Sequence, residues 1–143
     1  MIDTRTAPWA ALALRVSLGV MLLAHGLVLK VMTFGFAGTA GFFESIGYPG
    51  FLAYVVIALE VVGGIALILG VWSRVVALAL VPVLIGATLV HLPAGWLFSA
   101  PNGGWEFPAF WTVALMVQAL LGDGALALRP TPSFGAARQT ALA

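Results

Sequence analysis

The stretch that decides the fold is residues 51–92, FLAYVVIALEVVGGIALILGVWSRVVALALVPVLIGATLVHL. It contains two long apolar runs, residues 51–72 and 75–92, and its charged side chains are Glu60 and Arg74. An α-helix rises about 1.5 Å per residue, so roughly 20 apolar residues cross a hydrocarbon core of about 30 Å. Each run therefore predicts a membrane-spanning helix, and the two helices are joined by a short turn around Arg74.

The rest of the chain has the same apolar character. Of the 143 residues, 62% are hydrophobic and 8% are charged, and the mean hydropathy is +1.12. Two more apolar runs, 9–29 and 107–128, complete a set of four, and the chain has too few polar residues to coat them as a soluble core. We expect an all-α polytopic membrane protein, a four-transmembrane-helix bundle within residues 1–130. Residues 131–143 are expected to form a flexible tail.

The charged residues divide between the two sides of this bundle. One side holds Arg5, Arg74, Arg129 and Arg138, with Arg15 just inside the first span, whereas the other holds only Lys30, Glu44 and Glu106. Because positive residues collect on the cytoplasmic side, both termini are predicted to be cytoplasmic, and the loops 30–50 and 93–106 face outward. The chain has no cysteine and a net charge of +1 without a basic patch. Thiolate metal sites and nucleic-acid partners are therefore not expected, and no metal site is predicted.

Polar residues inside the spans are the functional candidates, because a polar or charged side chain is costly in hydrocarbon. Each histidine lies 16 residues from the cytoplasmic start of its span, which places both at about 24 Å depth. A lysine ends the first span at that face and a glutamate begins the fourth. We therefore predict a ligand or proton site around one outward-opening cavity, formed by His25, Lys30, His91 and Glu106.

A second prediction concerns Arg15 and Glu60. Glu60 lies near mid-membrane in the second span, and the long side chain of Arg15 can reach inward from the cytoplasmic end. The two are expected to form a buried ion pair, which serves either catalysis or helix registry. Purely structural roles stay open for the outer residues: hydrogen-bonded histidines, a lysine that extends to the interface, and a glutamate at a helix N-terminus.

The order of several short motifs resembles the DoxX family of small four-helix bacterial membrane proteins. The motifs are LRVSLGVMLLAHGLVLK (14–30), ALEVVGGIALILGVWSRVVAL (58–78), LIGATLVHLPAGW (84–96), NGGWEFP (102–108) and LLGDGALAL (120–128). The resemblance covers about residues 10–130. It directs attention to matching positions in this chain, namely Arg15, His25, Gly26, Lys30, Glu60, Gly64, Arg74, His91 and Glu106.

The resemblance implies a multi-pass protein of the bacterial plasma (inner) membrane with an association with redox physiology. Relatives include a membrane subunit of a thiosulfate:quinone oxidoreductase and partners of oxidative-stress enzymes. It implies a membrane or soluble oxidoreductase partner beside the lipid bilayer, and a homo-oligomer is compatible with it. It implies no single reaction, so whether the chain is itself an enzyme is left open.

Three functions follow from these residues. The first is a redox-associated component that binds a quinone-like or other small amphipathic molecule at the outer site; bis-histidine haem ligation by His25 and His91 is a variant. The second is a non-catalytic scaffold or assembly subunit of an oxidoreductase complex. The third is a small proton-coupled transporter that uses Glu60.

Overall fold

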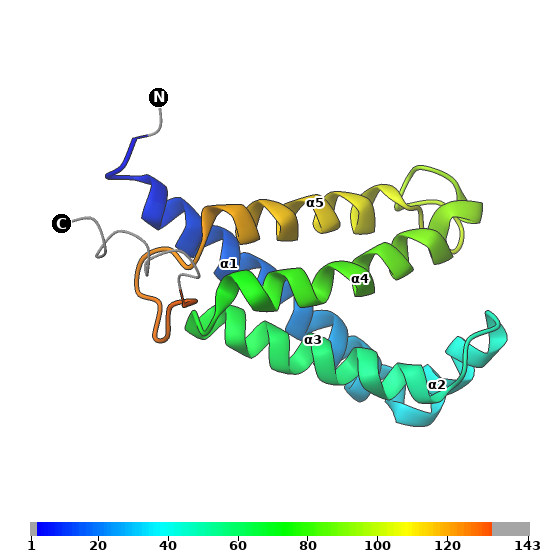
Figure 1. The fold of residues 1–143 in the computed structure, drawn as a ribbon. Helices are drawn as coiled ribbons and strands as arrows, with labels where there is room; N and C mark the ends of the chain where they lie inside the picture. The colour runs from blue at the N-terminus through cyan, green and yellow to red at the C-terminus, as the bar shows by residue number, and fades with distance from the viewer. Residues whose placement is uncertain (1–2, 133–143) are drawn as a thin grey trace, which may run out of the picture.

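The computed structural model describes residues 3–132 as a bundle of helices (Figure 1). In chain order the elements are α1 (Ala7–Leu23), η1 (Ala24–Thr33), α2 (Gly35–Ser45), α3 (Phe51–Leu69), α4 (Ser73–His91), η2 (Leu92–Ala94) and α5 (Glu106–Leu121). Helix α1 packs against α3, and α4 packs against α5. The shared core of buried residues is aliphatic apart from Trp111, and its largest members include Leu22, Leu67, Leu80 and Leu115.

The prediction of an all-α polytopic membrane protein is confirmed. Three continuous helices, Ala7–Thr33, Phe51–Leu69 and Ser73–Ala94, are long and apolar enough to cross a membrane. Many large apolar side chains face outward from the bundle, as a lipid-facing surface requires. Helix α5 is apolar but has 16 residues, so it rises only about 24 Å. The fourth crossing therefore stays a prediction.

The predicted fourth span ends earlier than expected. Helix α5 stops at Leu121 and does not continue to residue 128. Gly122 and Gly124 adopt φ angles of 93° and 72°, which glycine tolerates and a helix does not. The chain then crosses the end of the bundle, where the Leu128 amide donates to the Leu69 carbonyl at 3.1 Å. The predicted tail, 131–143, lies outside the described residues from 133 onward.

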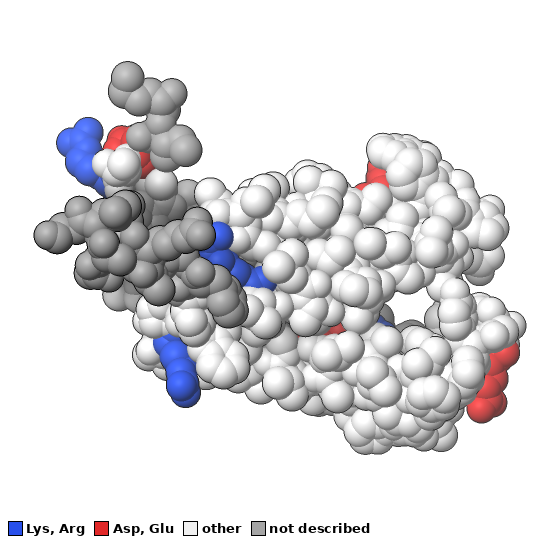
Figure 2. Space-filling model, in the orientation of Figure 1, with Lys and Arg blue, Asp and Glu red and all other residues white. Residues whose placement is uncertain are grey.

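Both described ends of the chain lie at one end of the bundle, called here the terminal end. The Ala125 amide donates to the Pro8 carbonyl at 2.9 Å, and the Trp72 amide donates to the Arg129 carbonyl at 2.9 Å. Basic side chains gather at this end, as Figure 2 shows. This arrangement fits termini that share one side of the membrane, and the cytoplasmic assignment of that side stays a prediction.

Asp123 organises the turns at the terminal end. Its carboxylate accepts hydrogen bonds from the Ser73 amide, the Thr131 amide and the Thr131 hydroxyl at 2.8, 2.8 and 2.9 Å. Burial opposes ionisation of this carboxyl, but the hydrogen bonds from Thr131 and Ser73 outweigh that effect and lower its pKa. Asp123 thus ties the start of α4 to the segment that follows α5.

The opposite end, called here the open end, contains an element that the sequence did not reveal. Residues 30–50 were expected to form a loop, yet the first helix continues to Thr33 and α2 follows it. Helix α2 packs on η1 and α3. Figure 1 shows it diverging from the outer ends of α4 and α5, so that the bundle opens into two arms. The first arm is η1, α2 and the neighbouring half of α3; the second is the ends of α4 and α5 with loop 92–105.

Candidate functional site

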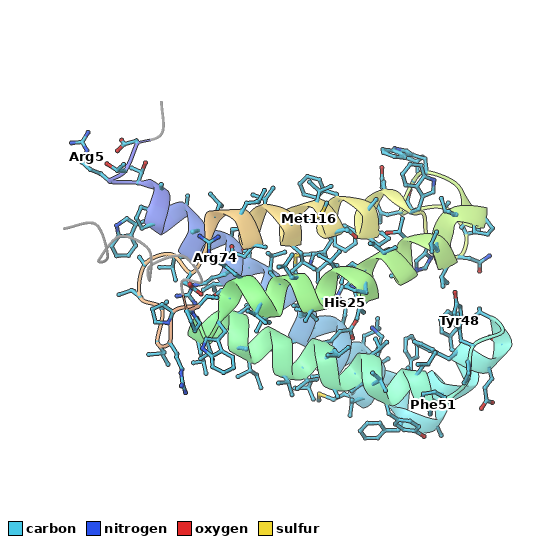
Figure 3. The ribbon with its side chains drawn as sticks, in the orientation of Figure 1. Arg5, His25, Tyr48, Phe51, Arg74 and Met116 are labelled. Atoms are coloured by element: carbon cyan, nitrogen blue, oxygen red, sulfur yellow. The ribbon has the colours of Figure 1, made fainter. Side chains whose placement is uncertain are left out.

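A large cavity lies between the two arms at the open end. Its volume is about 1010 Å³, and the surface is visibly hollowed between the arms (Figure 2). In Figure 3, His25 lies between the terminal end, marked by Arg5 and Arg74, and the open end, marked by Tyr48 and Phe51. The polar side chains that line this open-end cavity are His25, Lys30, Thr39, Glu60 and His91. Its aromatic walls are Phe34, Phe42, Phe43, Phe98, Phe107 and Trp111.

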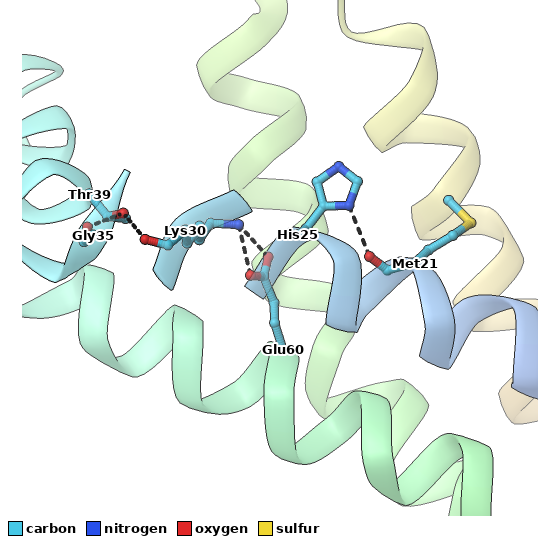
Figure 4. A network of polar contacts seen from close by, with 6 residues as sticks. All are labelled: Met21, His25, Lys30, Gly35, Thr39 and Glu60. Carbon is cyan, nitrogen blue, oxygen red and sulfur yellow. Dashed lines mark hydrogen bonds and ion pairs between the residues drawn. The ribbon is translucent and has the colours of Figure 1, made fainter. Parts of the chain in front are cut away.

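Lys30 and Glu60 form an ion pair in the cavity wall (Figure 4). The Lys30 ammonium donates to both carboxylate oxygens of Glu60, at 2.8 Å to Oε1 and 2.7 Å to Oε2. The Lys30 side chain is 19% exposed and that of Glu60 is 7% exposed. Lys30 was expected at the membrane face where the first span ends, but the helix continues past it and turns it inward toward α3.

Local helix geometry makes this pair possible. Residues 24–33 form a π-helix, in which hydrogen bonds join residues five apart, so His25 and Lys30 lie one turn apart on its surface. Gly26 faces Glu60, and a Cβ at this glycine would lie 2.8 Å from the Cβ of Glu60. Any larger residue at position 26 would therefore push η1 away from α3 and stretch the pair.

The ion pair expected between Arg15 and Glu60 is not formed. Arg15 is buried near the terminal end, and its guanidinium donates to the carbonyls of Leu67, Ile68 and Ala125 at 2.8, 2.6 and 2.9 Å. Two of these carbonyls belong to the last turn of α3, where the helix dipole favours a cation. Backbone oxygens thus take the place of the carboxylate, and Glu60 is paired with Lys30 instead.

His25 projects from the π-helix into the cavity wall. Its Nδ1 lies 2.9 Å from the Met21 carbonyl oxygen, and the other ring nitrogen points away from that helix in Figure 4. The ring meets the indole of Trp111 edge-on, with centroids 4.9 Å apart, and stacks near Phe107 at 6.4 Å. Helix α5 therefore fixes the orientation of His25 through ring contacts.

His91 lines the same cavity from the second arm, as its depth predicted. Its Nδ1 lies 3.1 Å from the Asn102 carbonyl oxygen. Asn102 and Gly103 have φ angles of 71° and 74°, and this turn carries the carbonyl back over the end of α4. The loop between α4 and α5 thus holds the His91 ring in place.

Glu106 does not join the group. The structure places it at the start of α5, where its Oε1 accepts a hydrogen bond from the Phe98 amide at 3.0 Å. Three of the four predicted outer residues, His25, Lys30 and His91, therefore share one cavity, and Glu60 takes the position expected for Glu106. The carboxylate of Glu106 instead closes loop 98–106 and lies at the positive end of a helix.

The part of the site that α2 and α5 supply was not predicted from the sequence. Thr39, Phe42 and Phe43 lie in a segment read as a loop, and Phe107 and Trp111 were not singled out as cavity residues. The spacing of Phe107 and Trp111, four residues apart on an apolar helix, places them on one face. That spacing is a signal that could have identified the second aromatic wall.

Comparison with known proteins places these residues in a family. The DoxX family model matches residues 10–93, a range that includes all five polar side chains lining the cavity. The chain belongs to the DoxX family. It is also 38% identical over 120 residues to the protein named "Putative oxidoreductase CatD" of Bacillus subtilis (strain 168), a match that covers 83% of this chain and 84% of that protein. No solved structure matches the chain.

In this DoxX-family member, the residues matched by the family model include only part of the cavity lining. His25, Lys30, Thr39, Glu60 and His91 all lie inside residues 10–93, whereas the aromatic wall from α5 lies outside it. The family match therefore spans the polar chemistry of the site. Within residues 3–132, no group of three or more His, Cys, Asp or Glu side chains is arranged to hold a metal ion.

Proposed function

We propose that this DoxX-family protein is a redox-associated component of the bacterial inner membrane that binds a quinone-like or other small amphipathic molecule in the open-end cavity. The observation that carries the proposal is the composition of the cavity wall. Aromatic rings from both arms surround a small set of polar groups on helices η1, α2, α3 and α4. A largely apolar wall with few polar groups is typical of small-molecule sites, whose volumes run from about 300 to 1,000 Å³.

The charges of the wall favour a neutral ligand. Lys30 and Glu60 neutralise each other at 2.7 Å, so the wall has no unbalanced charge with which to attract an ionic headgroup. A flat ring between aromatic side chains, with polar substituents near His25 and His91, matches what the wall offers. The membrane-embedded position of the helices suits a ligand that partitions into lipid.

The oxidoreductase relative supports a redox context. A protein of this kind would present the bound molecule to a membrane or soluble oxidoreductase partner. The transporter hypothesis is less well supported, because a proton carrier at Glu60 would first have to lose its two hydrogen bonds from Lys30. If no ligand binds, the hypothesis of a non-catalytic scaffold or assembly subunit is the better supported one.

Two glycines on α2 provide a matched test. Gly38 lines the cavity, and a Cβ there would make only an ordinary 3.7 Å contact with Phe34; Gly41 does not line it, and a Cβ there meets nothing within 4 Å. Gly38→Leu should therefore fill part of the cavity at little cost to folding, whereas Gly41→Leu makes the same change elsewhere on the helix.

The measurement is calorimetric titration of the full chain in lipid nanodiscs with a short-chain alkyl benzoquinone and its hydroquinone, with empty nanodiscs subtracted. We expect saturable binding of at least one form, weakened tenfold or more by Gly38→Leu and unchanged by Gly41→Leu. If neither form binds above the lipid background, or if both variants bind as the native chain does, the cavity is not the quinone site and the scaffold reading gains support.

A further inference from the structure

Hydrogen-bond direction in the cavity depends on how the two histidines are held. The Nδ1 atoms of His25 and His91 each lie within hydrogen-bond distance of a backbone carbonyl, at 2.9 and 3.1 Å. A carbonyl oxygen can only accept, so each Nδ1 carries the ring proton and donates it. In the uncharged imidazole the other nitrogen, Nε2, is then an acceptor. Each of these two cavity-lining histidines then has its ring lone pair at Nε2.

The other polar side chains of the cavity wall are also mainly hydrogen-bond acceptors. The Thr39 hydroxyl shares its one proton between the carbonyl oxygens of Lys30 and Gly35, each at 2.9 Å (Figure 4). It therefore has only lone pairs left for a further hydrogen bond. The Glu60 carboxylate is an acceptor throughout. Among the five polar side chains that line the cavity, Lys30 is the one that keeps a proton not donated to a protein acceptor, because it gives two of its three to Glu60.

Trp111 does not change this balance. Its indole Nε1 has no hydrogen-bond partner among the described residues, but the atom is fully enclosed and gives the cavity no exposed donor. The indole packs edge-on against the His25 ring, so its contribution is to hold that ring. The polar side chains of the cavity wall are therefore acceptors, with Lys30 as the partial exception.

We propose that the cavity prefers the reduced, hydroxyl-bearing form of its aromatic ligand, a hydroquinone, over the oxidised quinone. A hydroquinone brings two O–H donors to a wall of acceptors, whereas a quinone brings two carbonyl acceptors to the same wall and leaves lone pairs facing lone pairs. This inference rests on the proposed function and adds the chemical form of the ligand. His25 Nε2 is the acceptor that we assign to one hydroxyl.

The preference has a measurable redox consequence. A site that binds the reduced form more tightly raises the midpoint potential of the bound couple, because it stabilises the product of reduction. One hydrogen bond made in one form and absent in the other predicts about a tenfold difference in Kd. For a two-electron couple, a tenfold ratio corresponds to an upward shift of about 30 mV.

The experiment compares three ligands of the same ring and alkyl chain on the full protein in nanodiscs. These are the hydroquinone, the quinone, and the hydroquinone dimethyl ether, which keeps the ring oxygens but has no O–H. We expect the hydroquinone to bind about tenfold tighter than either of the others. His25→Phe, which keeps a ring beside Trp111 but removes the acceptor, should reduce this difference to threefold or less. Phe110→Leu, on a side chain that is 73% exposed on the outer surface, should leave it unchanged.

The outcomes separate this inference from the proposed function. If the quinone or the ether binds as tightly as the hydroquinone, the reduced-form preference is overturned while ligand binding in the cavity stands. If no ligand binds, the proposed function fails and this inference fails with it. If His25→Phe does not fold, the three-ligand comparison on the native chain still decides the preference.

Discussion

Breaking the Lys30–Glu60 pair on one side should cost much more than removing both partners together. Glu60→Met leaves the Lys30 ammonium in the cavity wall without a partner, and Lys30→Met leaves the Glu60 carboxyl in the same condition. The double substitution removes both charges and places two apolar side chains of similar length against each other. The perturbation is therefore a double-mutant cycle on one contact between η1 and α3.

The size of the effect follows from the burial of the two groups. Removing one partner of a buried ion pair costs about 3–5 kcal/mol, whereas replacing both with apolar residues is often neutral or stabilising. Lys30 is 19% exposed and Glu60 7% exposed, so partial hydration through the cavity places the single variants at the lower end. We expect each single substitution to lower the free energy of unfolding by about 3 kcal/mol, and the double to lie within about 1 kcal/mol of the native chain.

The assay is unfolding by sodium dodecyl sulfate in mixed micelles, followed by far-ultraviolet circular dichroism. A second cycle, Arg15→Lys with Glu60→Met, is the control, because the structure gives Arg15 backbone partners and no contact with Glu60. Its effects should add. Additive costs in the Lys30–Glu60 cycle would refute this pairing, and coupling in the Arg15–Glu60 cycle would support the pair expected from the sequence.

Two further predictions concern helix packing and the terminal end. Gly19→Ala should lower the free energy of unfolding in the same assay by about 1–3 kcal/mol, because its Cβ would lie 2.6 Å from the Gly64 carbonyl oxygen, whereas Gly86→Ala, with nothing within 4 Å of its Cβ, should not. The lowered pKa of Asp123 means that its stabilising effect is present above the ordinary aspartate pKa and is lost as pH falls through the lower, folded-state value. Thermal melts between pH 6 and pH 3 should therefore show an acid-dependent loss of stability that is smaller in Asp123→Asn; identical pH profiles would contradict this role.

Much of the fold could be predicted because membrane helices reveal themselves through composition alone. Length and hydropathy identified the helices at 51–69 and 73–91 to within a few residues, and counting residues along two spans placed His25 and His91 at one depth. Depth is a property of a single helix, so it can be read without knowledge of its neighbours. The shared cavity of these two histidines was predicted on that basis.

Pairings between helices could not be read in the same way, because they depend on rotation about each helix axis. The π-helix at 24–33 changes that rotation and turns Lys30 toward Glu60, and nothing in the apolar sequence signals the change. Arg15 was predicted to pair with Glu60 because acidic residues can be identified in a sequence, whereas backbone carbonyls that are free to accept a hydrogen bond cannot. Its partners at the end of α3 become visible only in three dimensions.

Around the open-end cavity, several features that cost stability occur together. A ten-residue π-helix replaces the more favourable α-helix, Gly26 weakens the helix that carries it, and a buried ion pair stands where apolar residues would pack at no desolvation cost. Each could be removed by simple substitution, and the terminal end shows that this chain can bury a cation whose hydrogen bonds all go to backbone carbonyls. Local departures from the most stable solution are expected where function constrains a site. Their convergence on the wall that holds His25 therefore favours ligand binding over a scaffold role, for which a sealed apolar core would be the more stable choice.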